Sequence, residues 1–286
     1  MDHSTRRDFV KGVGLGAAGL SLPALAAPPD SQTAPPASGV QPQTMPGRPP
    51  AAGVGAAGPA RVMSIAAHPG DAFFAMGLPI ALAVLQGGHG MFLSLSLGEK
   101  GSASIPPERY GAMQRDASEH AAREMGAPAA FLAYPDGEIP ANDEAAFAVC
   151  DQIRSYKPGV VITHWRGSWH KDHRACYKVV NDAIFYAALP ALARHAPAHS
   201  VGKLFFADNW EDAEGFTADT YLDVAPAFAR WLEACAMFPM WRGETGFRYN
   251  TYYQSLAAAR GCVSDFKYAV ALMSPSEQLV RRAHSL

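Results

Sequence analysis

Hydrophobic positions gather in five short runs along residues 61–207, and longer segments with helical spacing separate these runs. Each run is almost continuously apolar, as is typical of strands that are buried on both faces of a parallel sheet. Strands that alternate with helices predict an α/β domain with a mostly parallel central sheet. The expected strands are RVMSIAA (61–67), MFLSLSL (91–97), AAFLAY (129–134), GVVITH (159–164) and KLFFA (203–207).

The segments between the runs begin and end as helices do. Pro79 suits the first turn of one helix, because proline has no amide hydrogen to leave unpaired there. Gly126 suits the end of a helix over 109–127. Segment 143–158 has acidic residues at its start and basic ones near its end, which favours the helix dipole. Another helix, over 174–189, is expected after the fourth strand.

Polar, titratable segments follow the first four strands. In open α/β sheets, ligands bind outside the carboxyl ends of the strands. The sequence therefore predicts a functional site at this edge of the sheet. The segments are HPGD (68–71), GEKGS (98–102), PDGE (135–138) and HWRGSWHKDH (164–173).

Two of these segments contain residues that suit a metal ion. His68, Asp71 and His173 would supply two imidazoles and a carboxylate, and three protein ligands with one open position are typical of a catalytic zinc. Each motif alone has a simpler interpretation. Asp71 could cap a helix that begins at Ala72, and His173 could lie on a helix face without any ligand. Their occurrence together at strand carboxyl ends favours the metal site.

Five motifs, in order, give the chain a family resemblance over residues 61–275. The chain resembles the PIG-L / LmbE-like family of zinc-dependent de-N-acetylases, whose members carry AHPDDE after the first strand and HPDH after the fourth. The resemblance implies a Rossmann-like three-layer fold. The matching motifs are AHPGDA (67–72), GEKG (98–101), YPDG (134–137), HKDH (170–173) and ARG (259–261).

The same resemblance implies roles for individual residues. His68, Asp71 and His173 match the ligands of one Zn²⁺ per chain. His170 matches the side chain that acts as an acid or oxyanion partner, and Asp172 is in place to orient its imidazole. The implied reaction is hydrolysis of the amide of an N-acylated amino sugar or related glycoside, with zinc activating water. Arg115 lies near the position of a substrate-contacting arginine, although its spacing to Glu119 differs from the usual one.

Gly70 is the main departure from the family pattern, because it stands where the family has its general-base aspartate. General acid–base assistance typically contributes about 10²–10⁴-fold to rate. Three explanations stay open. Glu99, Asp136 or Asp172 could replace the base, or the scaffold could catalyse another hydrolytic reaction. The third explanation is a non-catalytic, zinc-binding relative that recognises carbohydrate.

The N-terminal residues predict export. STRRDFVK (4–11) resembles a twin-arginine signal, and the apolar segment that follows ends in Ala24-Leu25-Ala26, a pattern that signal peptidase cuts. That segment is too short and glycine-rich for a stable membrane span of about 20 residues. We expect a signal peptide (1–27), a Pro/Ala/Gly-rich disordered linker (28–60) and one de-N-acetylase-like α/β domain (61–286). The expected partner is the twin-arginine export machinery, and the expected location is periplasmic or secreted.

Charge and cysteine content exclude other classes of protein. The formal net charge of −2 gives no reason to expect nucleic acid or anionic lipid as a partner. The four cysteines form no CxxC pair, which excludes a zinc ribbon and gives no disulfide framework. Aromatic residues are dense in the last third of the chain, where they could stack on sugar rings, although packing on the sheet is the more ordinary role. These aromatic segments are NW (209–210), MFPMW (237–241) and FRYNTYY (247–253).

Overall fold

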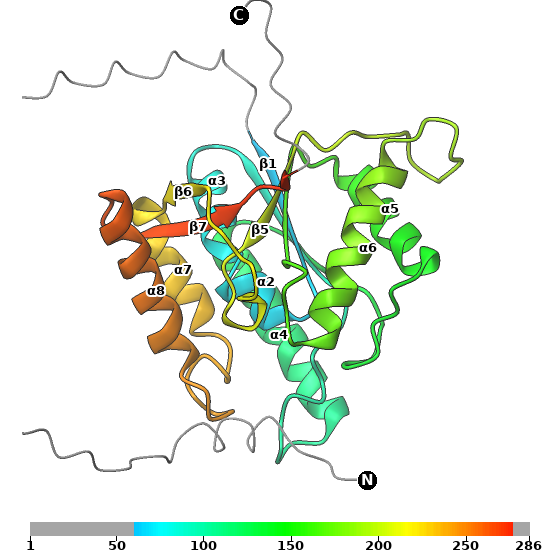
Figure 1. Ribbon diagram of the computed structural model, residues 1–286. Helices are drawn as coiled ribbons and strands as arrows, with labels where there is room; N and C mark the ends of the chain where they lie inside the picture. Colours follow the sequence, from blue (N-terminus) through cyan, green and yellow to red (C-terminus); the bar gives the residue numbers. More distant parts are fainter. Residues whose placement is uncertain (1–59, 277–286) are drawn as a thin grey trace, which may run out of the picture. The chain divides into compact units, whose positions relative to one another are not determined.

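The computed structural model describes residues 60–276, which form a seven-stranded sheet with helices on both faces (Figure 1). The predicted signal peptide and almost all of the predicted linker lie outside the described residues, and both stay predictions. The strand order is β3-β2-β1-β4-β5-β7-β6. The strands are β1 (Arg61–Ala66), β2 (His89–Ser94), β3 (Ala129–Phe131), β4 (Val160–Thr163), β5 (Lys203–Ala207), β6 (Thr220–Asp223) and β7 (Ala269–Met273).

The first five strands are mutually parallel, and each lies within a predicted apolar run or overlaps it. The predicted α/β fold with a mostly parallel sheet is therefore confirmed. Strands β6 and β7 were not predicted. Both run antiparallel to their neighbours, β7 against β5 and β6 against β7. Their segments, TYLD and AVALM, are short and carry either polar residues or several alanines, which are poor strand formers.

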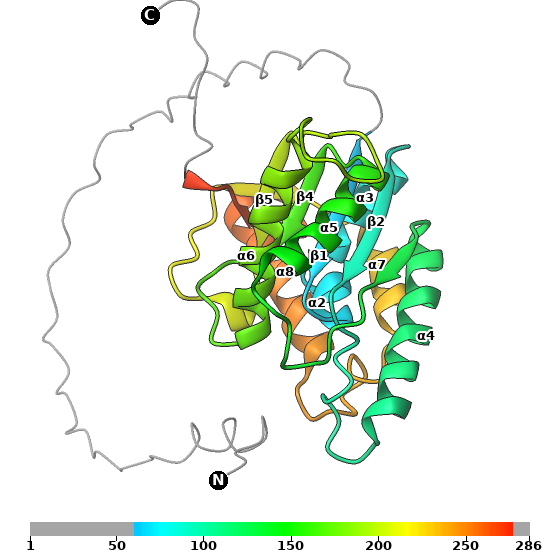
Figure 2. The ribbon, with the colours of Figure 1, turned by 90° about the vertical axis from the view of Figure 1, so that its right-hand side faces the viewer.

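Helices cover the two faces of the sheet in separate groups (Figures 1 and 2). Helices α5 and α6 pack on one face, and α2, α3, α4, α7 and α8 pack on the other. Two 3₁₀ turns, η1 (Trp210–Asp212) and η2 (Ala225–Ala227), interrupt the loops. The α-helices are α2 (Pro69–Phe74), α3 (Gly77–Leu85), α4 (Pro107–Met125), α5 (Asp143–Tyr156), α6 (Lys171–Ala187), α7 (Phe228–Cys235) and α8 (Tyr249–Ser264).

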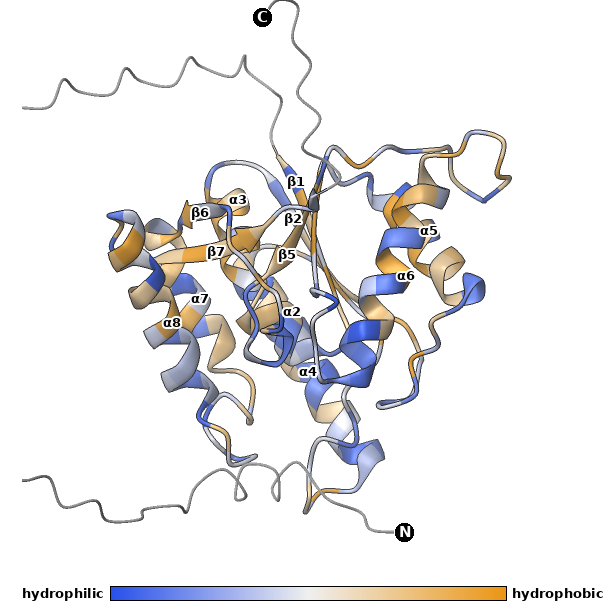
Figure 3. Ribbon diagram, viewed as in Figure 1, coloured by the Kyte–Doolittle hydropathy of each residue, from blue (hydrophilic) through white to orange (hydrophobic). Residues whose placement is uncertain are grey.

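One apolar cluster lies on each side of the sheet, and hydrophobic colour follows strands β1, β5 and β7 in Figure 3. On the side of α7, the Phe73 and Phe92 rings stack with centroids 4.1 Å apart. The indole of Trp231 donates a hydrogen bond to the Phe73 carbonyl at 2.8 Å. These contacts fix α2 against the sheet, so the residues at the start of α2 have a defined position.

Strands β1 and β4 are neighbours at the point where the strand order reverses. The chain leaves β1 toward β2 and β3 on one side, and later returns through β4 and β5 on the other. A crevice forms outside the carboxyl ends of strands at such a reversal. The segments that follow β1 and β4 both contain histidines, so the topology alone brings them together. No helix within residues 60–276 is long and apolar enough to cross a membrane.

Candidate metal centre

His68 and Asp71 lie at the start of α2, directly after β1. The helix begins at Pro69, with His68 in the N-cap position, so Asp71 belongs to the first turn and is not the capping residue. One oxygen of Asp71, Oδ2, lies 3.2 Å from Nδ1 of His68. The other oxygen, Oδ1, accepts a hydrogen bond from the side-chain amide of Asn209 at 3.0 Å. The carboxylate therefore faces the carboxyl edge of the sheet.

His173 enters the same place from the first turn of α6 and is completely buried. Its Nε2 lies 3.2 Å from Oδ2 of Asp71, and its Nδ1 lies 2.8 Å from Oδ1 of Asp212. The structure thus brings together the three residues that the sequence singled out as ligands. His68 and His173 each place one ring nitrogen 3.2 Å from the same Asp71 oxygen.

Two further carboxylates fix the ring of His68 from behind. Nε2 of His68 lies 3.1 Å from Oδ1 of Asp136 and 3.3 Å from Oδ2 of Asp172. Asp172 is itself held by the Gly137 amide, which donates to Oδ2 at 2.6 Å. Such partners on the far nitrogen orient a metal-binding imidazole and raise its basicity. Nδ1 is then left to face Asp71.

Asp172 therefore orients an imidazole different from the expected one. Its carboxylate is hydrogen-bonded to His68, whereas its backbone N–H donates to Nδ1 of His170 at 3.2 Å. His170 occupies the N-cap position of α6, and its ring stacks on His173 with centroids 4.5 Å apart. Because Nδ1 accepts a hydrogen bond, the neutral ring carries its hydrogen on Nε2. His170 is thus adjacent to the ligands and keeps a donor, as its predicted role requires.

The structure adds a fourth histidine that sequence reasoning did not assign. Nε2 of His164 accepts the Ala67 amide at 3.1 Å, and Nδ1 lies 2.8 Å from Oδ2 of Asp212. Burial, helped by the nearby His173, lowers the pKa of His164, so a neutral ring is favoured. Asp212 therefore holds two imidazoles at once. His164 also lies close to the proposed ligands, because its Nε2 is 3.9 Å from Oδ2 of Asp71.

Three further residues near the cluster were not predicted from the sequence. They are Asn209, Glu211 and Asp212, and all three lie in the segment after β5. Glu211 is only 4% exposed, and its Oε2 lies 3.4 Å from Nε2 of His173. The rule that drew attention to the first four strand ends applies equally to the fifth. The segment DNWED (208–212) follows the fifth predicted strand and carries three acidic side chains, which is the signal that points to these residues.

The charges of the cluster fit a cation. Burial alone would lower the pKa of His173, but Asp71 and Asp212 outweigh it and raise that pKa to about 10. Burial likewise opposes a charge on His68, yet hydrogen bonds with Asp136, Asp172 and Asp71 raise its pKa well above the usual value. The buried carboxylates thus stabilise positive charge on the histidines of the cluster. Protons supply it in the metal-free protein, and a divalent cation could take their place.

The clearest fit for a metal is Nε2 of His173. This atom is buried and makes no hydrogen bond of suitable geometry within residues 60–276, although Asp71 and Glu211 oxygens lie near it. Side-chain atoms of His68, His170 and His173 also lie within 4.8 Å of one another. Imidazole nitrogens and carboxylate oxygens are ligands that zinc accepts. A second such group contains Asp71, His164 and His173, and Asp71 lies 3.2 Å from both His68 and His173, so this donor set fits a zinc ion.

Gly70 lies beside this cluster, in the first turn of α2, and Met240 takes up the space next to it. A Cβ atom at position 70 would lie 3.2 Å from both Sδ and Cε of Met240. The Met240 sulfur is in turn 3.4 Å from the side-chain amide of Gln114. The room that a side chain at position 70 would need is thus partly filled by a thioether, which has no acid–base function.

The three carboxylates proposed as substitutes for the missing base have other contacts. Oε1 of Glu99 accepts the Asp136 amide at 2.8 Å, and Oε2 lies 3.3 Å from the Ser96 hydroxyl. Asp136 and Asp172 lie behind the His68 ring, as described above. Arg115 lies on the exposed side of α4, with its guanidinium 4.6 Å from the Phe131 ring centroid. Its role in substrate binding stays a prediction.

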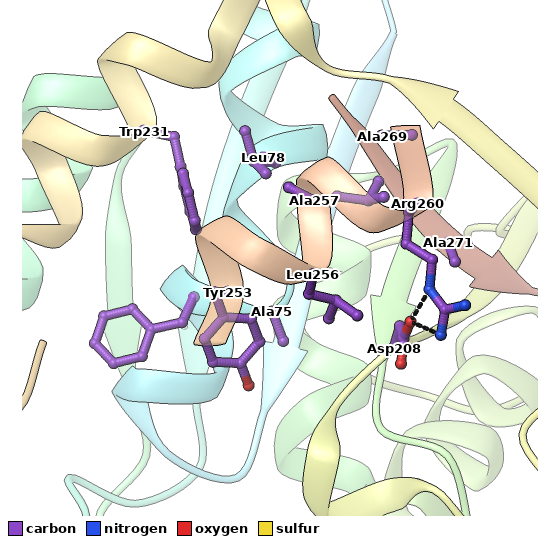
Figure 4. A pocket seen from close by; sticks show the side chains of 12 residues that line it. Ala75, Leu78, Asp208, Trp231, Tyr253, Leu256, Ala257, Arg260, Ala269 and Ala271 are labelled. Carbon is purple, nitrogen blue, oxygen red and sulfur yellow. Dashed lines mark hydrogen bonds and ion pairs between the residues drawn. The ribbon is translucent and has the colours of Figure 1, made fainter. Parts of the chain in front are cut away.

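The late ARG motif supports the site from the side of α8. Arg260 forms an ion pair with Asp208, with both Nε and NH2 2.7 Å from Oδ2. Figure 4 shows this pair beside a small pocket that is otherwise lined mainly by apolar side chains, with Tyr253 among them. The Tyr253 hydroxyl lies 3.5 Å from Oδ1 of Asn209. Helix α8 therefore holds both Asp208 and its neighbour Asn209, which contacts Asp71.

Two groups of aromatic residues have different surroundings. Phe74, Phe238 and Trp241 pack together in the core, as the packing interpretation predicted. Trp210 is only half-buried and stacks on Phe247 with centroids 4.7 Å apart. Trp169, which is 47% exposed, lies 5.8 Å from Trp210 and precedes His170. These three residues, Trp169, Trp210 and Phe247, form an aromatic wall next to the candidate site.

Fold and site together define a Rossmann-like α/β domain with a histidine–carboxylate cluster at the strand carboxyl ends. Residues 63–184 match the family model described as PIG-L: GlcNAc-PI de-N-acetylase. The family resemblance seen in the sequence is therefore confirmed over this part of the chain.

Three known proteins illustrate the likeness. A 1D-myo-inositol 2-acetamido-2-deoxy-alpha-D-glucopyranoside deacetylase of Streptomyces griseus is 26% identical over 182 residues, which cover 51% of this chain. The match spans only about half of that relative, 54% of its length. The structure of GalB, the 4-carboxy-2-hydroxymuconate hydratase of Pseudomonas putida, superposes with a TM-score of 0.71 at 20% identity, covering 79% of this chain and 99% of GalB. The N,N′-diacetylchitobiose deacetylase of Pyrococcus horikoshii gives a TM-score of 0.64 at 19% identity, covering 77% and 88%. At these identities the two structures establish the fold.

Proposed function

We propose that this protein is a metal-dependent hydrolase that deacetylates an N-acetylated amino sugar or a related glycoside. The observation that carries the proposal is the orientation of His173, whose buried Nε2 faces Asp71 while its Nδ1 is held by Asp212. His68 presents Nδ1 to the same carboxylate. Two imidazoles oriented from behind by carboxylates, with a third ligand between them, are typical of a metal site rather than of a structural ion pair.

A Zn²⁺ ion held by these three residues would polarise the amide carbonyl and lower the pKa of bound water to about 7. The protein's own residues do the rest. Asp136 and Asp172 keep the His68 ring in place, and Asp212 does the same for His173. His170 directs its Nε2 hydrogen to the oxygen that becomes negative when the carbonyl is attacked, and so stabilises that charge.

The sugar class rests on the relatives and on the aromatic wall. The Streptomyces griseus and Pyrococcus horikoshii proteins are both named for N-acetylated sugar substrates. Trp169, which is 47% exposed, lies beside His170, and Trp210 lies beside Trp169, so a sugar ring could stack there. We further propose export by the twin-arginine route, which rests on residues 4–27 alone.

A second candidate is a non-catalytic protein that binds zinc and carbohydrate. Gly70 favours it, because the general-base side chain of the family is missing and Met240 fills part of its space. Both candidates need the metal. They differ in turnover, since only the hydrolase releases acetate.

The test is acetate release from N,N′-diacetylchitobiose by the zinc-reconstituted chain, with binding of the same sugar measured in parallel. The hydrolase predicts acetate release that a chelator abolishes and that added zinc restores. His120→Ala is a suitable control variant, because His120 is exposed on α4 and outside the cluster. Sugar binding without acetate release would support the second candidate. If the chain neither binds the sugar nor releases acetate from it, the proposed substrate class is contradicted.

A further inference from the structure

We propose that Glu211 is the proton acceptor that replaces the general base missing at Gly70. This inference rests on the proposed hydrolase function and deepens it. Glu211 belongs to η1, which follows β5. Its carboxylate is 4% exposed, and Oε2 lies 3.4 Å from Nε2 of His173.

The position of Glu211 differs from that of the supporting carboxylates Asp136, Asp172 and Asp212. Asp136 and Asp172 contact the far nitrogen of His68, and Asp212 contacts the far nitrogen of His173. Those three orient the rings from behind. Glu211 instead meets His173 at Nε2, the nitrogen that faces Asp71. A carboxylate near this nitrogen lies on the side of the site where the substrate and the attacking water must meet.

The backbone of Glu211 is also firmly held. The side chain of Asn209 accepts the Glu211 amide at 3.1 Å through Oδ1, and donates to Asp71 through Nδ2 at 3.0 Å. The Glu211 carbonyl accepts the Trp169 amide at 3.2 Å and the Ser168 hydroxyl at 3.0 Å. One asparagine therefore sets the distance between Asp71 and Glu211, and the loop that carries His170 is tied to the same turn. A proton acceptor needs such fixed geometry.

Gly70 and Met240 explain why a substitute is needed. A thioether cannot accept a proton from water, and Met240 lies where a side chain at position 70 would extend. The base has therefore moved from the first turn of α2 to η1. The chemistry that it must perform is unchanged.

The step balances with water as the one co-reactant. Oε2 of Glu211 takes a proton from the attacking water while the water oxygen bonds to the acyl carbon and the carbonyl π electrons move onto the carbonyl oxygen. His170 stabilises that oxygen. When the electrons return, the C–N bond breaks and the nitrogen keeps the bonding pair. Glu211 passes its proton to this nitrogen, which leaves acetic acid, the free amine and the original carboxylate.

The experiment compares Glu211→Gln with Glu214→Gln in the zinc-reconstituted chain. Glu214 is exposed in the same segment, so its amide variant is a matched control. Three quantities are measured: zinc affinity by competition with a chelator, kcat for acetate release from N,N′-diacetylchitobiose, and metal-dependent hydrolysis of 4-nitrophenyl acetate. Glu211→Asp is added because it keeps the carboxylate in a fold-compatible side chain.

A proton acceptor predicts that Glu211→Gln keeps the zinc affinity of wild type and loses about 10²–10⁴-fold in kcat. Glu211→Asp should recover part of the rate, and Glu214→Gln should match wild type. A zinc affinity lowered tenfold or more in Glu211→Gln would make Glu211 a metal ligand and overturn the inference. Equal kcat values in Glu211→Gln and Glu214→Gln would overturn it as well.

Failure of the proposed function gives a different result. If wild type hydrolyses 4-nitrophenyl acetate but not the sugar amide, and Glu211→Gln loses the ester activity, the substrate class is wrong and Glu211 is supported. If wild type releases acetate from the sugar and Glu211→Gln does so equally, the function is supported and Glu211 is not. A metal-loaded wild type that hydrolyses neither compound would overturn both.

Discussion

Met240 lies against Gly70, with its sulfur and terminal carbon each 3.2 Å from the place where a Cβ of residue 70 would be. In the motif match that the sequence predicts, Gly70 takes the position of the family's general base. A glycine and a methionine together fill this space and leave it without acid–base chemistry. The rest of the cluster keeps its ligands and their supporting carboxylates.

The first prediction concerns this pair. Gly70→Asp alone should raise acetate release less than the double variant Gly70→Asp/Met240→Ala, because the new carboxylate needs the room that Met240 takes. In the Glu211→Gln background, the double variant should recover much of the lost rate, on the order of 10²-fold or more. Initial rates with N,N′-diacetylchitobiose check this. Met240→Ala alone is the control, and no gain in any background would show that position 70 lacks access to the reacting water.

The second prediction concerns the metal-free protein and pH. Burial lowers the pKa of His173, but Asp71 and Asp212 raise it to about 10 overall, above its ordinary value of 6.5. The folded protein thus keeps a proton that the unfolded chain releases. This contribution to stability is complete below about pH 6.5 and is lost as pH rises toward 10.

Urea unfolding of the chelator-treated protein at several pH values in this range would measure the effect. The free energy of unfolding should fall with rising pH more steeply in wild type than in His173→Gln, which has no titrating ring. Parallel profiles in the two proteins would contradict the assignment of the proton to His173.

The third prediction concerns the aromatic wall. Trp210→Ala should raise KM for N,N′-diacetylchitobiose about 2- to 10-fold. The variant removes the aromatic surface, formed by Trp210 stacked on Phe247, on which the sugar ring would pack. The kcat should change little, since Trp210 has no acid–base group. Phe185→Ala, a substitution at an exposed aromatic residue of α6, is the control. A fall in kcat with KM unchanged would instead show that Trp210 holds η1 in position and does not bind the sugar.

The sequence predicted the parallel half of the sheet well because strands buried on both faces are continuously apolar. It failed for β6 and β7, whose short segments pair antiparallel at the edge and owe their conformation to tertiary contacts. The proximity of His68, Asp71 and His173 could be predicted because all three follow strand ends. Fold topology then brings such residues together regardless of loop detail.

The supporting residues were harder to predict. Asp172 lies beside His170 in the sequence, yet its carboxylate turns to His68, because the Gly137 amide from another loop draws it there. Nothing in the local sequence encodes that contact. Glu211 and Asp212 also follow a strand end, but only their contacts with His173 distinguish them from other acidic loop residues.

The most direct test of the account is metal content. Purified protein should contain about one zinc per chain by mass spectrometry, and His173→Ala should lose it while His120→Ala keeps it. This pattern would establish that His173 closes a metal site with His68 and Asp71. If wild type binds no metal even after reconstitution, or if His173→Ala binds as much as wild type, the cluster is a structural network of ion pairs, and the hydrolase proposal fails with the metal site.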